Sequence, residues 1–323
     1  MSLLVTGGAG FIGSAFVRRR RAHHPDEPVV VLDALTYAGS RDNLAGVDVH
    51  FVHGDVCDGE LVARVLADHG VDRVVHLAAE SHVDRSILGP DAFVRTNVLG
   101  TATMLRAARE AGVARFLHVS TDEVYGELAP DEAPWTEAAP LAPRSPYAAS
   151  KAAADHLVQA FHATYDLPTL ITRCTNNYGP RQHPEKLIPL CTLAALDGRP
   201  LPLYGDGRQV RDWIHVDDHC DALELVLDSG EPGAVYHVAG NDPRENVAIA
   251  RGILAATDRP ETQLTYVTDR LGHDRRYALD ASKIARELGF TPTRRLGTAL
   301  AETVAWYRDH RAWCDAMLAR TQA

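Results

Sequence analysis

Short apolar runs alternate with longer stretches of mixed polarity through the first half of the chain. The apolar runs cover residues 3–7, 29–33, 50–55, 71–79, 116–120 and 169–174. The stretches between them include 11–24, 58–69, 89–112 and 145–166, which have the length and apolar spacing of helices. Strands and helices that alternate in this way predict an α/β fold with a Rossmann-type doubly wound parallel sheet.

The pattern changes after residue 175, where prolines at positions 184, 189, 200 and 202 separate short elements. Two later apolar runs, 213–216 and 235–239, are again typical of buried strands, and a long helix is expected over 296–318. A length of 323 residues also favours two lobes, because single cores rarely grow beyond about 250–300 residues. We expect a Rossmann domain over 1–175, to which 212–240 returns, and a smaller α/β lobe from 176–211 and 241–323.

Charge and composition narrow the classes of partner. Lysine and arginine number 33 against 43 acidic residues, and the net charge of -10 repels a polyphosphate backbone, so no nucleic-acid partner is expected. The sequence has no long apolar run and no charged leader, which predicts a cytoplasmic protein without membrane contact. Its five cysteines lack CxxC spacing and indicate reduced thiols.

A glycine-rich turn follows the first expected strand, with glycines at positions 7, 10 and 13. Between a strand and a helix, such glycines allow a tight turn, a close approach of pyrophosphate to the backbone, and close packing of the helix. Asp33 ends the second strand 20 residues after Gly13, where a carboxylate accepts ribose hydroxyls and repels a 2′-phosphate. The turn therefore predicts NAD rather than NADP. Asp55, at the end of the third strand, is expected near the adenine, with a turn-forming role as the alternative.

Tyr147 and Lys151 stand four residues apart at the start of an expected helix, so they share one helical face. A nearby ammonium favours the phenolate, which can then take a proton from an alcohol. Only three of the 33 basic residues are lysines, at positions 151, 186 and 283, which favours a specific role for Lys151. Thr121 ends a strand 26 residues before Tyr147 and supplies a hydroxyl to orient the substrate alcohol.

Asp122 and Glu123 follow Thr121 at the carboxyl end of the fifth strand, where open α/β sheets bind ligands. Two adjacent carboxyl groups can have their pKa values driven apart by their surroundings, so that one donates a proton and the other accepts one. We expect this pair to act as acid and base.

Two histidine-containing patterns predict no metal site. His215 and His219 flank Asp217 and Asp218, but Asp217 is expected to cap the helix that follows, and His219 to lie on that helix's surface. His82 is expected to be structural.

Taken together, several motifs resemble the extended short-chain dehydrogenase/reductase family, and within it the group of dTDP-glucose 4,6-dehydratases. They are the glycine pattern, Asp33, the run 77–84, Thr-Asp-Glu-Val-Tyr-Gly at 121–126, Tyr-x-x-x-Lys, and Asn-Asn-Tyr-Gly-Pro at 176–180. The resemblance covers nearly the whole chain. The glycine and Tyr-Lys motifs are generic in the superfamily, whereas the Asp-Glu pair separates this group from decarboxylases with Thr-Ser-Glu and from 4-epimerases that lack both acids.

The resemblance implies a lyase that converts dTDP-glucose to dTDP-4-keto-6-deoxy-glucose and water. Hydride passes transiently to a tightly bound NAD, which is regenerated in each turnover, and the pathway is deoxysugar biosynthesis, antibiotic biosynthesis included. Tyr147 takes the proton of the carbon-4 hydroxyl, Glu123 takes the carbon-5 proton, and Asp122 protonates the departing carbon-6 hydroxyl. The alternative is another NAD-dependent nucleotide-sugar decarboxylase or 4-epimerase. A non-catalytic NAD sensor is disfavoured, because Tyr147 and Lys151 are both present.

Binding residues are implied position by position. For NAD they are Gly7, Gly10, Phe11, Ile12, Gly13, Asp33, Leu35, Thr36, Asp55, Val56, Leu77, Ala78, Ala79, Ser81, Thr96, Ser120, Tyr147, Lys151 and Asn177. For the nucleotide sugar they are Ser81, Thr121, Asp122, Glu123, Asn176, Lys186, Leu187, Pro202, Tyr204, Arg211, Asn246, Asp269, His273 and Tyr277. Leu271 departs from the family pattern, which has proline there and hence a stiffer loop.

The resemblance also implies a homodimer with a four-helix interface. Helices 89–112 and 145–166 carry apolar residues on more than one face, and the second of them has Ala152, Leu157, Val158 and Phe161. A helix that is covered by a sheet on one side and is still apolar on another favours a partner.

Overall fold

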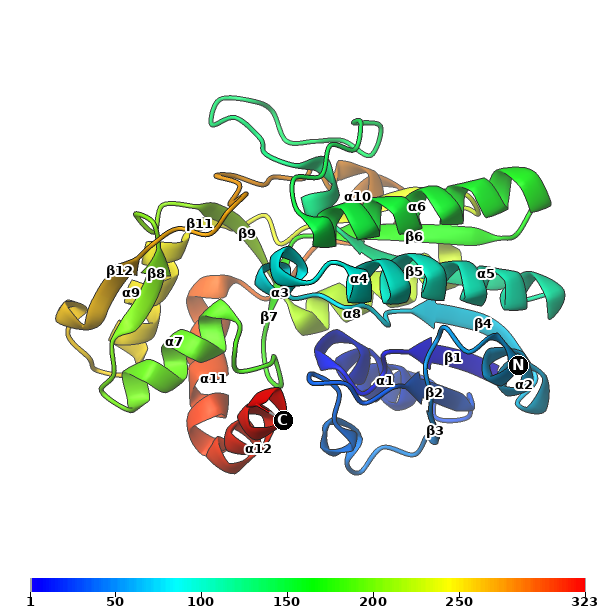
Figure 1. Ribbon diagram of the computed structural model, residues 1–323, viewed down its shortest axis with the longest axis horizontal. Helices are drawn as coiled ribbons and strands as arrows, with labels where there is room; N and C mark the ends of the chain where they lie inside the picture. The colour runs from blue at the N-terminus through cyan, green and yellow to red at the C-terminus, as the bar shows by residue number, and fades with distance from the viewer. Residues whose placement is uncertain (1, 323) are drawn as a thin grey trace.

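Seven parallel strands form the central sheet of the larger lobe in the computed structural model, which describes residues 2–322 (Figure 1). Their order across the sheet is β10-β6-β5-β4-β1-β2-β3. The bounds are β1 Ser2–Thr6, β2 Val29–Asp33, β3 His50–His53, β4 Val71–His76, β5 Arg115–Thr121, β6 Thr169–Cys174 and β10 Val235–Val238. The chain order reverses between β1 and β4, so ligands are expected at the carboxyl ends of these strands. The predicted doubly wound fold is confirmed.

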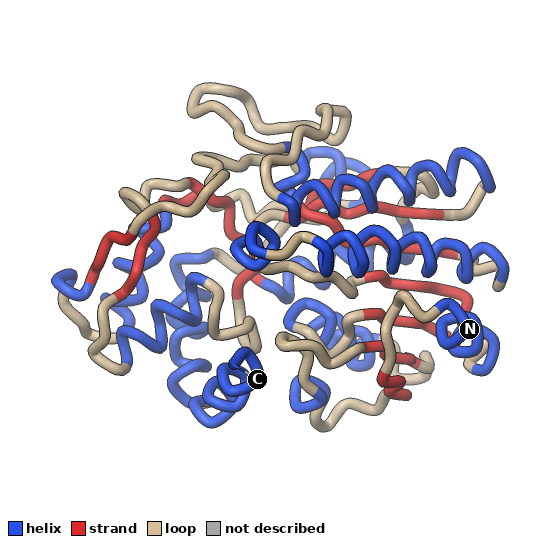
Figure 2. Tube along the Cα trace, viewed as in Figure 1, coloured by secondary structure: helices blue, strands red, loops and turns tan. Residues whose placement is uncertain are grey.

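Helices cover both faces of this sheet, which explains why the strands read as nearly continuous apolar runs. The helices run alongside the strands of the central sheet (Figure 2). One core packs side chains of α1, α8 and α10 against the sheet, and the other packs those of α2, α5 and α6. These helices span α1 Phe11–His23, α2 Gly59–Asp68, α5 Thr101–Glu110, α6 Pro146–Tyr165, α8 Val216–Ser229 and α10 Ser282–Leu288. Two short helices, α3 Val83–Leu88 and α4 Asp91–Phe93, precede α5.

The smaller lobe contains two small sheets and its own core. A three-stranded sheet has the order β11-β9-β7, and β8 pairs in parallel with β12. The strands are β7 Asn176–Tyr178, β8 Leu201–Tyr204, β9 Val210–His215, β11 Pro243–Glu245 and β12 Leu264–Val267. The helices are α7 Leu187–Leu196, α9 Asn246–Ala256, α11 Leu296–Asp309 and α12 Arg311–Gln322. Of the two strands expected in the returning segment, β10 joins the central sheet, whereas β9 belongs to the three-stranded sheet.

Two expected helices are interrupted. A π-helical turn at Val94–Gly100 stands between α4 and α5, and it brings the buried Asn97 side chain to the backbone of Glu80 and to the Ser150 hydroxyl. The last helix breaks at His310, whose ring stacks on Trp306 at 4.3 Å between centroids. The break turns α12 back against α11, so that Cys314 packs with Tyr307.

Candidate active site

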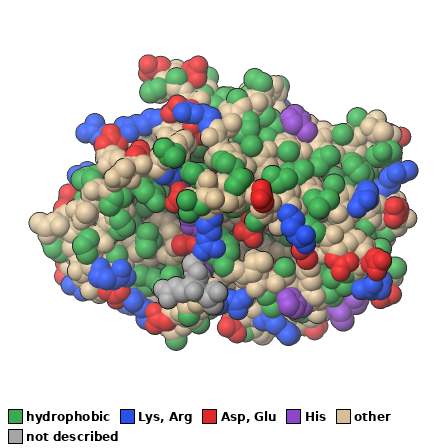
Figure 3. All heavy atoms as spheres, in the orientation of Figure 1, with side chains coloured by type: hydrophobic (Ala, Val, Ile, Leu, Met, Phe, Trp, Pro, Cys, Tyr) green, Lys and Arg blue, Asp and Glu red, His purple; other side chains and the backbone are tan. Residues whose placement is uncertain are grey.

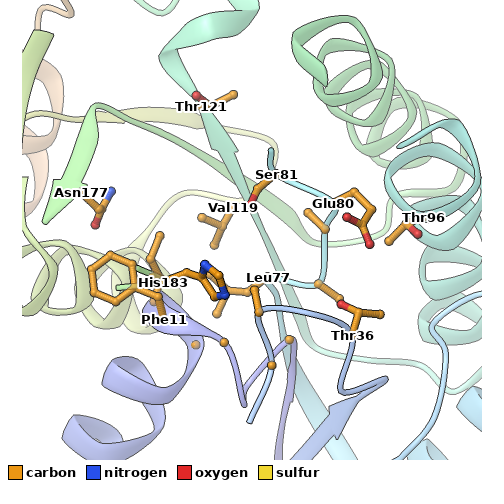
Figure 4. Close-up of a pocket in the computed structure, with 18 of the residues that line it drawn as sticks. Phe11, Thr36, Leu77, Glu80, Ser81, Thr96, Val119, Thr121, Asn177 and His183 are labelled. Atoms are coloured by element: carbon orange, nitrogen blue, oxygen red, sulfur yellow. The ribbon is translucent and has the colours of Figure 1, made fainter. Parts of the chain in front are cut away.

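A cavity of about 370 Å³ lies at the carboxyl ends of the central strands, where the chain order reverses (Figure 4). In Figure 4, Thr121 lies at one end of this cavity and Thr36 at the other, while Asn177 and Glu80 stand on opposite walls. Every residue predicted to bind NAD lines the cavity except Leu35. All five predicted catalytic residues line it as well: Thr121, Asp122, Glu123, Tyr147 and Lys151.

The glycine turn has little room for side chains. Gly7 has a φ of +68°, and a Cβ there would lie 2.7 Å from the backbone nitrogen of Ala78. A Cβ at Gly13 would lie 2.2 Å from the carbonyl oxygen of Gly7, because α1 packs directly on the turn. Gly10 borders the cavity, and a Cβ there has only the Gly7 oxygen, at 3.3 Å, as a neighbour. Glycine is therefore required at positions 7 and 13 by the packing of the turn, whereas at position 10 it leaves the backbone accessible from the cavity.

Asp33 holds the glycine turn and the loop after β2 together. Its carboxylate accepts the backbone N–H of Ala9 at 2.9 Å and that of Leu35 at 2.8 Å. Burial raises the pKa of Asp33, and these two hydrogen bonds counteract that effect. Leu35 does not line the cavity, but its backbone N–H contacts Asp33, the residue expected to bind the ribose hydroxyls.

Asp55 has the contacts of a turn-forming residue and also borders the cavity. It lines the cavity, and it also accepts the N–H of Cys57 at 2.9 Å and a hydrogen bond from Arg95 at 2.7 Å. Burial acts to raise the pKa of Asp55, but these hydrogen bonds outweigh it and lower the pKa below its ordinary value.

The acid pair begins the 3₁₀ helix Asp122–Tyr125, directly after β5. The Thr121 hydroxyl accepts the N–H of Glu123 at 3.3 Å and donates to Oδ1 of Asp122 at 3.2 Å. Asp122 is only 2% exposed, and burial together with the charge of Glu123 raises its pKa to about 8. Burial also raises the pKa of Glu123, while Arg270, Arg211 and Lys186 lower it. Asp122 is therefore protonated at neutral pH, the state that a general acid needs.

Tyr147 and Lys151 lie on the first turns of α6, which Ser145 caps by accepting the N–H of Ala148. The Lys151 ammonium donates to the carbonyl of Val119 at 2.8 Å, so the lysine is anchored to β5. Burial raises the pKa of Tyr147 well above its ordinary value, and the charges of Glu123 and Asp122 add to this effect. A hydrogen bond with Thr121 acts in the opposite direction. Burial therefore favours the neutral phenol over the phenolate.

Residues predicted to bind the sugar nucleotide divide into two sets. Ser81, Thr121, Asn176 and Lys186 line the cavity together with the acid pair. Eight others lie outside its lining, all within 176–211 or 241–323, namely Leu187, Pro202, Tyr204, Arg211, Asn246, Asp269, His273 and Tyr277.

Part of this outer set forms contacts of its own. The Tyr204 ring stands edge-on to His273, whose Nδ1 lies 2.6 Å from Oδ1 of Asp269. The Arg211 guanidinium lies over the Tyr277 ring at 4.2 Å and donates to the carbonyl of Asp274. Arg211 also lowers the pKa of Asp122 and of Glu123, so its charge reaches the acid pair.

Several cavity residues were not predicted from the sequence. Tyr37 is the clearest, since Arg85 lies 3.9 Å above its ring and His183 meets it edge-on at 5.3 Å. These contacts join segments that are far apart in the chain, and no local motif marks them. Others in this group are Gly39, Glu80, Val119, Cys174, Thr175 and Gln182. Among these residues, Glu80 belongs to the run 77–84, and that motif is the one feature of the sequence that could have indicated its place in the cavity.

Two helix assignments near the cavity were wrong. His215, not Asp217, caps α8, because its Nδ1 accepts the N–H of Asp217 at 3.2 Å. His219 is fully buried rather than on the surface, since α8 turns that face toward Asn177, whose Oδ1 lies 2.8 Å from its Nδ1. His82 caps the short helix α3. Within residues 2–322, no group of three His, Cys, Asp or Glu side chains could hold a metal ion.

A glycine turn at the switch point of a doubly wound sheet, an aspartate ending β2, and a Tyr-Lys pair beside two buried acids define an extended short-chain dehydrogenase/reductase. A family model described as GDP-mannose 4,6 dehydratase matches residues 4–303, and the chain belongs to this family. The resemblance seen in the sequence motifs is confirmed.

Known relatives share nearly the whole chain. The dTDP-glucose 4,6-dehydratase of Xanthomonas campestris pv. campestris (strain B100) is 52% identical, over 98% of this chain and 95% of the relative. The crystal structure of DesIV, a dTDP-glucose 4,6-dehydratase from Streptomyces venezuelae with NAD and TYD bound, has a TM-score of 0.95 and 54% identity, covering 98% of this chain and 100% of that one. UDP-glucose 4-epimerase of Thermus thermophilus, in complex with NAD, has a TM-score of 0.90 at 32% identity, covering 96% of this chain and 100% of that one.

Proposed function

We propose that this chain is an NAD-dependent lyase that converts dTDP-glucose to dTDP-4-keto-6-deoxy-glucose and water. The observation that carries this proposal is the buried acid pair Asp122–Glu123 in the same cavity as Tyr147 and Lys151. A Tyr-Lys pair supplies the base that alcohol oxidation by NAD needs, whereas elimination of water requires a further acid and base. Relatives near 50% identity that carry this name support the assignment.

The cavity fits a dinucleotide. Gly10 has no side chain where the glycine turn borders the cavity, and the Asp33 carboxylate ends β2 beside it. When bound, NAD supplies the acceptor and donor of hydride, and the glycine turn, Asp33 and the loops after β2, β3 and β4 would hold it. Solved dTDP-glucose 4,6-dehydratases with NAD bound support this choice.

Proton transfer is assigned to this chain's own side chains. Tyr147 takes the proton of the carbon-4 hydroxyl, which Thr121 orients, and the fixed charge of Lys151 favours the phenolate while this happens. The resulting carbon-4 carbonyl acidifies the carbon-5 hydrogen, which Glu123 removes. Asp122 donates its proton to the departing carbon-6 hydroxyl, as its raised pKa allows at neutral pH. Arg211 and Tyr277 place the nucleotide end of the substrate in the smaller lobe.

The two lobes divide the binding work in this proposal. Residues 1–175 with 212–240 hold NAD, and residues 176–211 with 241–323 hold the sugar nucleotide. The pairing of β10 with β6, and the packing of α8 on the central sheet, support assigning the middle of the returning segment to the first lobe. Strand β9, which belongs to the small sheet, marks the boundary between them.

A second copy of the chain is proposed to cover the α5–α6 face. Val158 belongs to the core, with Leu157 and Phe161 packed against it, so these residues supply no uncovered face. The support comes from Val94 and Leu99, which are 55% and 50% exposed just before α5.

We place the enzyme in the cytoplasm and in deoxysugar biosynthesis, antibiotic biosynthesis included. None of the helices within residues 2–322 is long and apolar enough to cross a membrane. On the face shown in Figure 3, basic side chains are interspersed with acidic ones.

The purified chain, incubated with dTDP-glucose and no added NAD, tests the function. Mass spectrometry should show loss of one water, and NMR should show a new methyl group at carbon 6. Tyr147→Phe is the control, because it keeps the ring but removes the base. Unchanged sugar after NAD is supplied would reject the proposal, and an epimerised or decarboxylated sugar from a UDP-sugar panel would establish the alternative that shares this fold.

A further inference from the structure

A buried charged group lies behind Lys151, on the side away from the cavity. Asp155 follows Lys151 by one helical turn on α6, so Tyr147, Lys151 and Asp155 lie along one face of the helix. Asp155 is 0% exposed, and it does not line the cavity. A carboxylate this deep is costly unless it is paired, and its partners show what it does there.

Asp155 is connected both to Lys151 and to β6. Nε of Arg173 donates to Oδ2 of Asp155 at 2.8 Å. The other oxygen, Oδ1, lies 3.6 Å from Nε2 of His118, and the same nitrogen lies 3.4 Å from Nζ of Lys151. His118 therefore stands between the ammonium and the carboxylate. Burial lowers the pKa of His118 well below its ordinary value, so this imidazole is neutral and carries no charge of its own.

The groups around Lys151 leave Asp155 as the counter-charge. Burial lowers the pKa of Lys151 to about 8, and Asp155 is the foremost group that raises it. The next such group, the Cys174 thiol, is neutral because burial raises its own pKa to about 12. The titratable and charged groups that face this region are Tyr147 and Asp155 on α6, His118 on β5, Arg173 and Cys174 on β6, and His76 on β4.

We propose that Asp155 is a positioning residue of the active site, which keeps Lys151 charged and thereby keeps Tyr147 competent as the base. Arg173 holds the Asp155 carboxylate in place from β6 and, through its second nitrogen, contacts the Tyr125 hydroxyl. The proposal rests on the role of Tyr147 in the proposed function. The charge of Lys151, however, can be measured without substrate.

The scarcity of lysine makes that measurement direct. Lysine labelled with ¹³C at Cε gives signals from only three side chains, Lys151, Lys186 and Lys283, and Lys186→Arg and Lys283→Arg assign them. An NMR titration should give Lys151 a midpoint near pH 8 in the unaltered protein. In Asp155→Asn the midpoint should fall by about one pH unit or more, a tenfold loss of proton affinity.

Asp218→Asn is the matched control. Asp218 is also a buried carboxylate, and it accepts hydrogen bonds from Thr293 and Arg294 far along the chain. This variant should lower the melting temperature and leave the Lys151 midpoint unchanged. If both variants shifted the midpoint equally, the effect would be one of general destabilisation and the proposal would be overturned.

Activity supplies a second readout. In Asp155→Asn the high-pH limb of product formation should move to lower pH with the lysine midpoint. At pH 8 the charged fraction of Lys151, and with it kcat, should fall about fivefold or more, with KM unchanged. A protein that forms no product from dTDP-glucose in any variant, yet shows the shifted midpoint, would reject the proposed function while the effect of Asp155 on the charge of Lys151 would stand.

A double variant guards against failure to fold. Asp155→Asn together with Arg173→Gln removes both charges of the ion pair, so that Arg173 is not left as an unpaired buried charge. The double variant should regain stability but keep the lowered Lys151 midpoint. A folded double variant whose midpoint stays within about 0.3 pH units of the unaltered protein would reduce Asp155 to a structural ion pair.

Discussion

The indole N–H of Trp313 donates to Oδ1 of Asn43 at 2.9 Å, which ties the last helix of the chain to the loop after β2. Nδ2 of Asn43 in turn donates to the carbonyl of Ala9 in the glycine turn at 2.9 Å. Arg320, also on α12, donates to the carbonyl of Leu35 at 3.0 Å. Helix α12 therefore holds together the two segments that border the expected adenosine end of the cavity.

The substitution Trp313→Phe should speed the dissociation of NAD. The variant keeps the ring but removes the hydrogen bond to Asn43, which contributes about 1 kcal/mol, or roughly fivefold in an equilibrium. The measurement is the NAD that remains bound after gel filtration, and its dissociation rate. Trp306→Phe is the control. The Trp306 ring packs on those of His310 and Trp313, so this variant changes the same aromatic cluster but keeps the hydrogen bond of Trp313 to Asn43. If the two variants retained the same amount of NAD, the hydrogen bond between Trp313 and Asn43 would have no part in holding the cofactor.

Asp122→Asn should separate oxidation from elimination. The amide keeps the shape of the side chain but has no acidic proton to donate, so dehydrated product should fall by about 100-fold or more. Tyr147 and Lys151 are untouched, so reduction of NAD should continue, and absorbance at the NADH band should rise on mixing with dTDP-glucose. Product formation at the unaltered rate would remove Asp122 from its proposed role as acid.

Asp122 should also make stability depend on pH. Its folded-state pKa of about 8 lies above the ordinary value of 3.8, so between these values the folded chain holds a proton that the unfolded chain has released. The stabilisation from this group is complete below pH 4 and is lost as the pH rises through 8. Asp122→Asn does not lose this stabilisation. The melting temperature of the variant, relative to that of the unaltered protein, should therefore rise between pH 5 and pH 9. Each kcal/mol corresponds to about 2 °C. A constant difference across that range would contradict the raised pKa.

Local motifs predicted many of the residues that line the cavity, because each motif depends on a few residues at fixed spacing. Gly7, Gly10 and Gly13 meet in one turn by chain geometry alone, and Tyr147 and Lys151 are neighbours on any helix. The positions of Asp122 and Glu123 follow from the end of a strand in a parallel sheet. Such features do not require knowledge of the rest of the fold.

The other walls of the cavity depend on contacts between distant segments. Tyr37 meets Arg85 and His183 only after three separate parts of the chain have packed together. The break at His310 is equally invisible in the apolar spacing of 296–318, because the stacking on Trp306 and the hydrogen bond of Trp313 to the first lobe decide it. His219 was misplaced for the same reason, since its partner Asn177 lies 42 positions away.

Alanine substitutions at Gly13 and Gly10 should affect different properties, the first stability and the second NAD affinity. Gly13→Ala places a Cβ 2.2 Å from the Gly7 oxygen and 2.8 Å from Cα of Gly8, both backbone atoms, so it should cost about 3 kcal/mol of stability or prevent folding. Gly10→Ala has only one close neighbour at 3.3 Å and should stay within about 1 kcal/mol of the unaltered protein while NAD affinity falls about tenfold. Thermal unfolding and NAD titration check both. Equal losses of stability would show that Gly10, too, serves the fold rather than the cofactor.

Leu99→Glu should convert the proposed dimer to a monomer. Leu99 is 50% exposed beside Val94 on the turn that leads into α5, and a carboxylate there is solvated in a monomer but desolvated against a second copy. Light scattering at micromolar concentration should give about half the mass of the unaltered protein. Leu225→Glu is the matched control, because Leu225 is 36% exposed on α8, which packs on the other face of the central sheet. An unaltered protein that is already monomeric, or a Leu99→Glu variant that stays dimeric, would place the interface elsewhere or remove it.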